Sequence, residues 1–105
     1  MKAKPIGTIS GWSYSPGGHV MQTTYPADGS IALFIEDVQG IREAIATVCL
    51  KDLDLKPEPN HVFLKSWSEN TGLVEALVEA NIVKLTGKKI RVSAFAEAIE
   101  AELMV

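Results

Sequence analysis

The residues best suited to chemistry lie close together in one short segment, residues 65–72. The segment contains four side chains that can bind a ligand: Lys65, Trp67, Glu69 and Asn70. A lysine and an asparagine, together with the free amides of a helix start, can hold a small anion or another polar group. The segment therefore predicts a binding site where a strand meets a helix.

The same segment also fits a purely structural role. Serine and asparagine are common helix caps, and a glutamate in the first turn complements the helix dipole. Ser66 or Ser68 would then cap the following helix, with Glu69 completing a capping box with Ser66. Because capping explains every residue type present, and because Glu69 would repel an anion, we prefer the structural interpretation.

The two histidines and the single cysteine do not form a catalytic or metal-binding pattern. His19 and His61 each adjoin an apolar strand and have no cysteine or carboxylate at ligand spacing. Cys49 has no basic neighbour in its apolar stretch to activate the thiol, so we expect a small core residue. The sequence indicates no cofactor, no metal and no catalytic residue. A binding protein is therefore favoured over an enzyme.

Length and composition predict one globular unit. A chain of 105 residues with 47% hydrophobic and 22% charged residues can build a single core, so we expect residues 1–105 to form one α+β domain. The sequence has no apolar signal core and no run long enough to cross a membrane. With one cysteine and no disulfide, we expect a cytoplasmic location.

The charge distribution argues against nucleic-acid binding. Ten basic and thirteen acidic residues give a net charge of −3. One local basic cluster occurs, over residues 84–91: Lys84, Lys88, Lys89 and Arg91. We interpret this cluster as a turn, Thr86-Gly87-Lys88, between two short strands. Nucleic-acid binding through this basic turn is the weakest functional alternative.

Hydrophobic patterning and turn residues predict a mainly antiparallel, twisted sheet. The expected strands are Ile6–Tyr14, His19–Tyr25, Ile31–Glu36 and His61–Trp67, joined by turns at Ser15–Gly18, Pro26–Gly29 and Asp37–Gly40. Because both faces of Ile31–Glu36 are apolar, we expect this strand to be central. Leu73, Val74, Leu77 and Val78 recur at helical spacing, which predicts one amphipathic helix over residues 71–80, packed on one face of the sheet and ended by Asn81.

Two segments fit both helix and strand. Val38, Ile41, Ile45 and Val48 have helical spacing, but Ile41–Leu50 is rich in β-branched residues and lacks a good cap. Phe95, Ile99 and Leu103 also recur at helical spacing, and the alanine and glutamate content of the tail favours a second, C-terminal helix. The same tail also alternates as a strand does.

The motif Lys65-x-Trp67-Ser68-Glu69-Asn70-x-Gly72, followed by an apolar helix and Thr86-Gly87, resembles a family of short bacterial and mobile-element proteins of uncharacterised activity. The similarity extends from about Tyr25 to Leu103. It implies that Ile41–Leu50 is a strand, although this chain lacks the tyrosine and proline typical of that region. It also implies that Phe95–Leu103 pairs into the sheet. No activity is implied.

Together these observations predict a non-catalytic protein-interaction module. We expect an inhibitor or adaptor, and the resemblance adds an origin in a phage or another mobile element. The alternative is a small polar-ligand binder, or an unusual small enzyme, with its site at the corner 65–72 and one histidine. Exposed strand edges are compatible with either a monomer or a homodimer.

Overall fold

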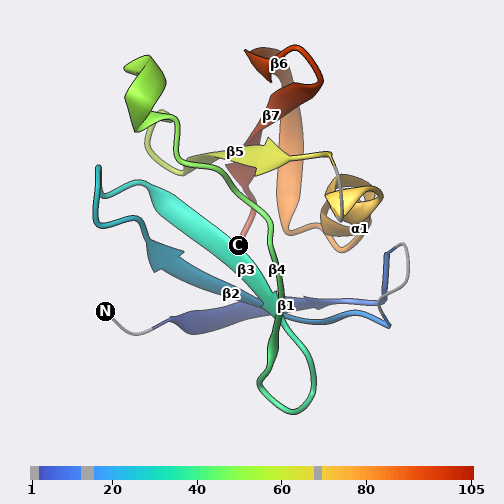
Figure 1. The fold of residues 1–105 in the computed structure, drawn as a ribbon. Helices are drawn as coiled ribbons and strands as arrows, with labels where there is room; N and C mark the ends of the chain where they lie inside the picture. Colours follow the sequence, from blue (N-terminus) through green and yellow to red (C-terminus); the bar gives the residue numbers. More distant parts are fainter. Residues whose placement is uncertain (1–2, 13–15, 68–69) are drawn as a thin grey trace.

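The computed structural model describes residues 3–12, 16–67 and 70–105. Over these residues it is an α+β fold with two antiparallel sheets and one α-helix, so the predicted fold class is confirmed (Figure 1). The first sheet has the order β1 (Lys4–Ile9), β2 (Gly18–Thr24), β3 (Ile31–Glu36), β4 (Arg42–Ile45). The second has the order β5 (His61–Lys65), β7 (Ala96–Leu103), β6 (Val83–Ser93), and the helix is α1 (Leu73–Glu79).

The first sheet follows the predicted order because its turns are local. Asp37 Oδ1 accepts hydrogen bonds from the backbone nitrogens of Gln39 and Ile41, both at 2.9 Å, and Gly40 has a φ of 82°. An aspartate at the start of a turn and a glycine at positive φ are the features that close such a hairpin. As expected, β3 is central, between β2 and β4.

The helix is confirmed, but its predicted cap is wrong. Its N-cap residue is Gly72, with a φ of 89° and no side-chain cap, while the Ser66 hydroxyl donates instead to the backbone oxygen of Glu97. Ser68 lies outside the described residues. Asn81 ends the helix as predicted, because it adopts a φ of 59° and lets the nitrogen of Ile82 bond back to the oxygen of Leu77.

Both ambiguous segments contain strands. Residues 42–45 form β4, and residues 96–103 form β7, which pairs with β5 on one side and β6 on the other. The helix preferred for the tail from composition is therefore wrong. The central position of β7 in the second sheet buries Ala98, Ala101 and Leu103, and this burial outweighs the weak helix propensity of the tail.

The predicted basic turn over residues 84–91 is also wrong. Residues 83–93 form the single strand β6, and the register against β7 shifts between Leu85 and Lys89. Gly87, with a φ of 92°, lies inside this bulge. The Thr-Gly-Lys sequence that resembles a turn therefore supplies the extra residues of a β-bulge, and the basic side chains lie along a strand.

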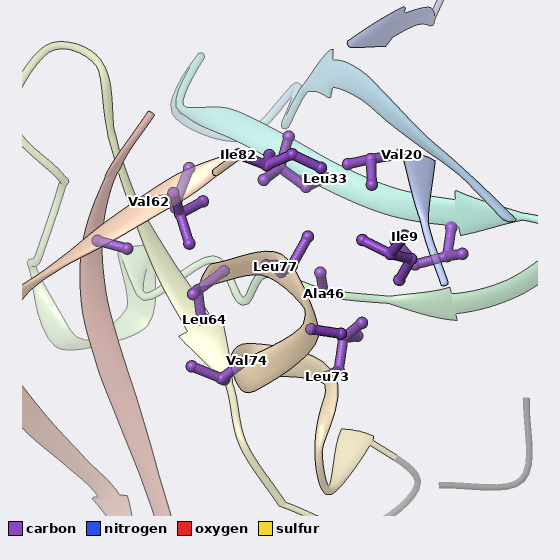
Figure 2. Packing of buried hydrophobic residues seen from close by; sticks show 14 of the residues in the cluster. Ile9, Val20, Leu33, Ala46, Val62, Leu64, Leu73, Val74, Leu77 and Ile82 are labelled. Carbon is purple, nitrogen blue, oxygen red and sulfur yellow. The ribbon is translucent and has the colours of Figure 1, made fainter. Parts of the chain in front are cut away.

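Side chains from both sheets and the helix build the main core. Leu73, Val74 and Leu77 project from α1 toward buried residues of both sheets, among them Val20, Leu33, Val62 and Leu64 (Figure 2). The helix is turned slightly from the predicted stripe, since Ala76 is buried and Val78 is 37% exposed. A smaller cluster around Leu50, Phe63 and Ala98 packs on the other side of the second sheet.

Residues 46–48 join the two sheets. The backbone nitrogen of Ala46 donates to the oxygen of Leu33 in β3, and two residues later the nitrogen of Val48 donates to the oxygen of Phe63 in β5. Thr47 forms a bridge with Leu64. The chain therefore leaves one sheet and pairs with the other at this point. It then passes through the 3-10 turn η1 (Lys51–Leu53), and Cys49, before this turn, is half-buried outside any strand.

Candidate functional site

Lys65 and Trp67 lie where β5 ends. Lys65 is the last residue of β5 and is paired with Ala98, near the start of β7. The Lys65 ammonium lies 6.0 Å from the centroid of the Trp67 ring, within cation–π distance. Trp67 is half-buried and packs against the cluster of Leu50, Phe63 and Ala98. Part of the indole ring is thus anchored, and part faces solvent.

Asn70 has a structural position. It is fully buried, and its Nδ2 donates to the backbone oxygen of Ile45 at 2.7 Å and to that of Lys65 at 3.5 Å. The amide therefore ties the end of β4 to the end of β5 beside the start of α1. Its Oδ1 has no hydrogen-bond partner among the described residues. Glu69, the fourth predicted site residue, lies outside the described residues.

Neither histidine meets this corner. His61 is the first residue of β5, four residues before Lys65, which corresponds to about 13 Å along a strand. Its Nδ1 lies 2.9 Å from the carbonyl oxygen of Pro59, and because a carbonyl only accepts, Nδ1 carries the hydrogen. His19 is exposed on β2 of the other sheet. The structure therefore separates the histidines from Lys65 and Asn70.

The turn between β6 and β7 lies beside the corner. The Ser66 hydroxyl donates to the backbone oxygen of Glu97 at 3.1 Å, which fastens the end of β5 to the start of β7. Phe95 stands in this turn and is 96% exposed. A hollow of about 190 Å³ is lined by residues of the turn, including Arg91 and Glu97. We call the surface formed by Arg91, Phe95 and Glu97 the hairpin-end surface. Lys65 pairs with Ala98, the neighbour of Glu97, so its side chain lies on the opposite face of the sheet from those of Arg91 and Glu97.

The sequence did not identify Phe95 as a surface residue. Its spacing with Ile99 and Leu103 fits both a helix and a strand, and neither pattern indicates that Phe95 is exposed. In the structure the backbone nitrogen of Phe95 lies 3.4 Å from the Ser93 hydroxyl, which accepts its hydrogen bond. A serine hydroxyl that accepts a hydrogen bond from the backbone nitrogen two residues later is a known feature of turns. Ser93 could therefore have predicted a turn at residues 94–95.

Two of the four basic residues of β6 face acidic residues of β7. Lys84 is paired with Glu102, and Arg91 is paired with Glu97. Glu100 is buried and accepts a hydrogen bond from the Thr86 hydroxyl at 2.7 Å. Acidic and basic side chains are thus mixed across β6 and β7, whereas a nucleic-acid-binding surface is continuously basic along the phosphate backbone that it contacts.

Two groups with shifted pKa values lie apart from the hairpin-end surface. Burial raises the pKa of Tyr25, whose hydroxyl shares a hydrogen bond of 2.8 Å with the hydroxyl of Thr47. A hydrogen bond from the Ser30 hydroxyl, at 2.6 Å, lowers the pKa of Asp28. Tyr25 and Asp28 both lie in the loop after β2, and their hydrogen bonds stabilise the conformation of this loop.

Among the described residues, no group of three or more His, Cys, Asp or Glu side chains is placed to hold a metal ion. None of the helices in the described part of the chain has the length and apolar character needed to cross a membrane.

The fold defines an α+β protein with two antiparallel sheets. Comparisons with protein-family models, with curated proteins and with solved structures find no match to this chain. The resemblance drawn from the 65–72 motif therefore stays a prediction, and functional inference rests on the geometry of the surface.

Proposed function

We propose that this protein is a non-catalytic protein-interaction module, of the inhibitor or adaptor kind, which binds its partner through the hairpin-end surface. The observation that carries the proposal is the exposure of Phe95, at 96%. An exposed phenylalanine gains no burial when the chain folds, whereas burying it against a partner is worth about 1.5–3 kcal/mol. A turn tip also presents the ring without obstruction.

Phe95 lies beside a residue type that is common in protein-binding hot spots. Arginine is enriched at such sites, and the hairpin-end surface contains Arg91. The Ser66–Glu97 hydrogen bond fixes the turn against the end of β5. A pre-ordered aromatic surface loses little conformational entropy when it binds, which favours affinity.

At the Phe95 turn, the geometry supports a protein partner over a small ligand. The hollow beside Phe95, about 190 Å³, is smaller than the roughly 300 Å³ at which small-molecule pockets begin. Asn70, on which a small-ligand site at this corner depended, is buried and donates to two backbone carbonyls. Lys65 and Trp67 lie at the end of β5 and do not line this hollow.

The test is affinity capture of the tagged full-length chain from the lysate of its native cells, after nuclease treatment. The informative variant is Phe95→Asp. The matched control is Val38→Asp, since Val38 is 87% exposed in the β3–β4 turn at the other end of the molecule (Figure 1). Circular dichroism and thermal unfolding verify that each variant is folded.

We expect a specific protein to copurify with the wild type and with Val38→Asp, and to be lost with Phe95→Asp. The proposal fails if no protein copurifies with a folded bait. It also fails if the Phe95 variant retains every captured protein at wild-type levels.

A further inference from the structure

The strand β6 has a free edge. It is the terminal strand of the second sheet, and within the described residues it pairs only with β7. It is the longest strand of the structure, with 11 residues, most of which are exposed. An edge strand presents unpaired backbone N–H and C=O groups, to which an extended segment of another chain can add as a further strand.

This edge is basic although the protein as a whole is acidic. Four of the ten basic residues lie on β6, in a chain of net charge −3: Lys84, Lys88, Lys89 and Arg91. Lys89 and Arg91 are two positions apart, so their side chains share one face of the strand. An incoming strand with acidic residues at alternate positions would place them beside these two cations.

The same charges disfavour the edges of this protein itself as occupants. Pairing β6 with the β6 of a second copy would bring lysines and Arg91 together, and like charges on neighbouring strands destabilise a sheet. The first sheet has two terminal strands. One of them, β1, carries Lys4 and also Pro5, which lacks a backbone N–H. The other, β4, has only 4 residues and carries Arg42. The charge pattern thus selects a different chain with acidic side chains.

We propose that the free edge of β6 binds an acidic, extended segment of a partner protein, which adds to the second sheet as a fourth strand. The inference rests on the proposed function, because β6 leads directly into the Phe95 turn and the same partner would contact both. The main-chain hydrogen bonds supply affinity, and the basic side chains select acidic sequences.

The test is an NMR titration of the isotope-labelled full-length chain with three short synthetic peptides. The first alternates glutamate and valine, the second has lysine in place of glutamate, and the third is the glutamate peptide with alternate backbone nitrogens methylated. We expect the glutamate peptide to shift the β6 amides and to slow their hydrogen exchange. The other two peptides should bind at least about tenfold more weakly.

Charge neutralisation provides the matched pair of variants. Lys89→Gln with Arg91→Gln should weaken binding of the glutamate peptide by about tenfold. Lys4→Gln with Lys51→Gln changes the net charge equally, away from β6, and should leave binding within about twofold. The spectra of the unbound variants show whether each is folded.

The inference fails if the glutamate peptide shifts amide signals outside β6, or if the glutamate and lysine peptides bind equally. It also fails if a single-stranded oligonucleotide binds β6 more tightly than the glutamate peptide, or if β6 forms a concentration-dependent dimer. Its failure is distinguishable from that of the proposed function. If Phe95→Asp abolishes capture of a protein that the Lys89 and Arg91 variant still captures fully, the edge inference fails alone. If the glutamate peptide binds β6 but Phe95→Asp changes no capture, the hairpin-end proposal fails alone.

Discussion

The hydroxyl oxygen of Thr47 lies 3.1 Å from the backbone nitrogen of Leu33 and accepts its hydrogen bond. The oxygen of Leu33 points the same way and is bonded by the nitrogen of Ala46 at 2.8 Å. At Thr47 the chain stops pairing with β3 and pairs with Leu64 of β5 instead. The Thr47 hydroxyl therefore replaces the backbone carbonyl that would otherwise accept the hydrogen bond from the Leu33 N–H. Thr47 is 1% exposed and Leu33 is fully buried, so the Leu33 N–H has no access to water.

Replacing Thr47 with valine should therefore destabilise the fold. Valine has nearly the same shape but leaves the Leu33 N–H and the Tyr25 hydroxyl without this partner. We expect a loss of about 1–3 kcal/mol in the free energy of unfolding, measured by urea denaturation. Thr47→Ser keeps the hydroxyl and should retain more of the stability. Equal stability of the valine and wild-type proteins would contradict this role.

The buried amide of Asn70 should be required for stability. Asn70→Ala removes the donor to the carbonyls of Ile45 and Lys65, which costs about 1–3 kcal/mol. Asn70→Asp should cost more at neutral pH, because it buries a carboxylate against two carbonyl oxygens. Thermal unfolding of the two variants measures the difference. An aspartate variant as stable as the alanine variant would show that the carbonyls do not face this side chain.

Truncation of Phe34 should lower the free energy of unfolding, whereas truncation of Phe95 should leave it nearly unchanged. Phe34 is 6% exposed, with the Arg42 guanidinium 4.2 Å from its ring centroid, so Phe34→Ala should cost about 3 kcal/mol in unfolding free energy. Phe95 is 96% exposed, so Phe95→Ala should change stability by no more than about 0.5 kcal/mol. Chemical denaturation compares the two. A large loss at Phe95 would mean that its ring packs within the protein.

Asp28 should contribute to the fall of stability in acid. The Ser30 hydrogen bond holds its pKa below the ordinary value of 3.8. Since the folded pKa is lower than the unfolded one, the stabilisation is fully present above the unfolded pKa and is lost as pH falls through the folded pKa. Asp28→Asn should lower stability at neutral pH and make the decline in acid shallower.

Thermal unfolding at a series of pH values checks this dependence. Ser30→Ala is the control, because it removes the 2.6 Å donor while keeping the carboxylate, and it should weaken the acid dependence in part. If Asp28→Asn loses stability in acid as steeply as the wild type, the carboxylate is not responsible.

Where structure depends on neighbours in the sequence, the sequence predicted it well. The Asp37–Gly40 turn, the central apolar strand over residues 31–36 and the helix ended by Asn81 all follow from local residue types. Turn chemistry and hydrophobic periodicity act over a few residues, so a single sequence contains the necessary information.

The positions of the proposed site residues depend on which strands pair. Lys65 and Trp67 lie where β5 ends, whereas Asn70 is buried and donates a hydrogen bond to the Ile45 carbonyl, 25 residues away in the sequence. The spacing of Phe95 with Ile99 and Leu103 fits both a helix and a strand, and neither pattern indicates that Phe95 is exposed. Neither outcome follows from spacing alone, since each depends on which strands pair.

The sequence by itself determined the α+β class, the turns at Pro26–Gly29 and Asp37–Gly40, and the helix. The tertiary structure decided that the chain forms two sheets joined at residues 46–48, that the tail is the central strand of the second sheet, and that residues 83–93 form one bulged edge strand. In each case local preferences for helix or turn are worth a few tenths of a kcal/mol per residue. The non-local burial of Ala98, Ala101 and Leu103 between β5 and β6 is worth more, and it sets the fold.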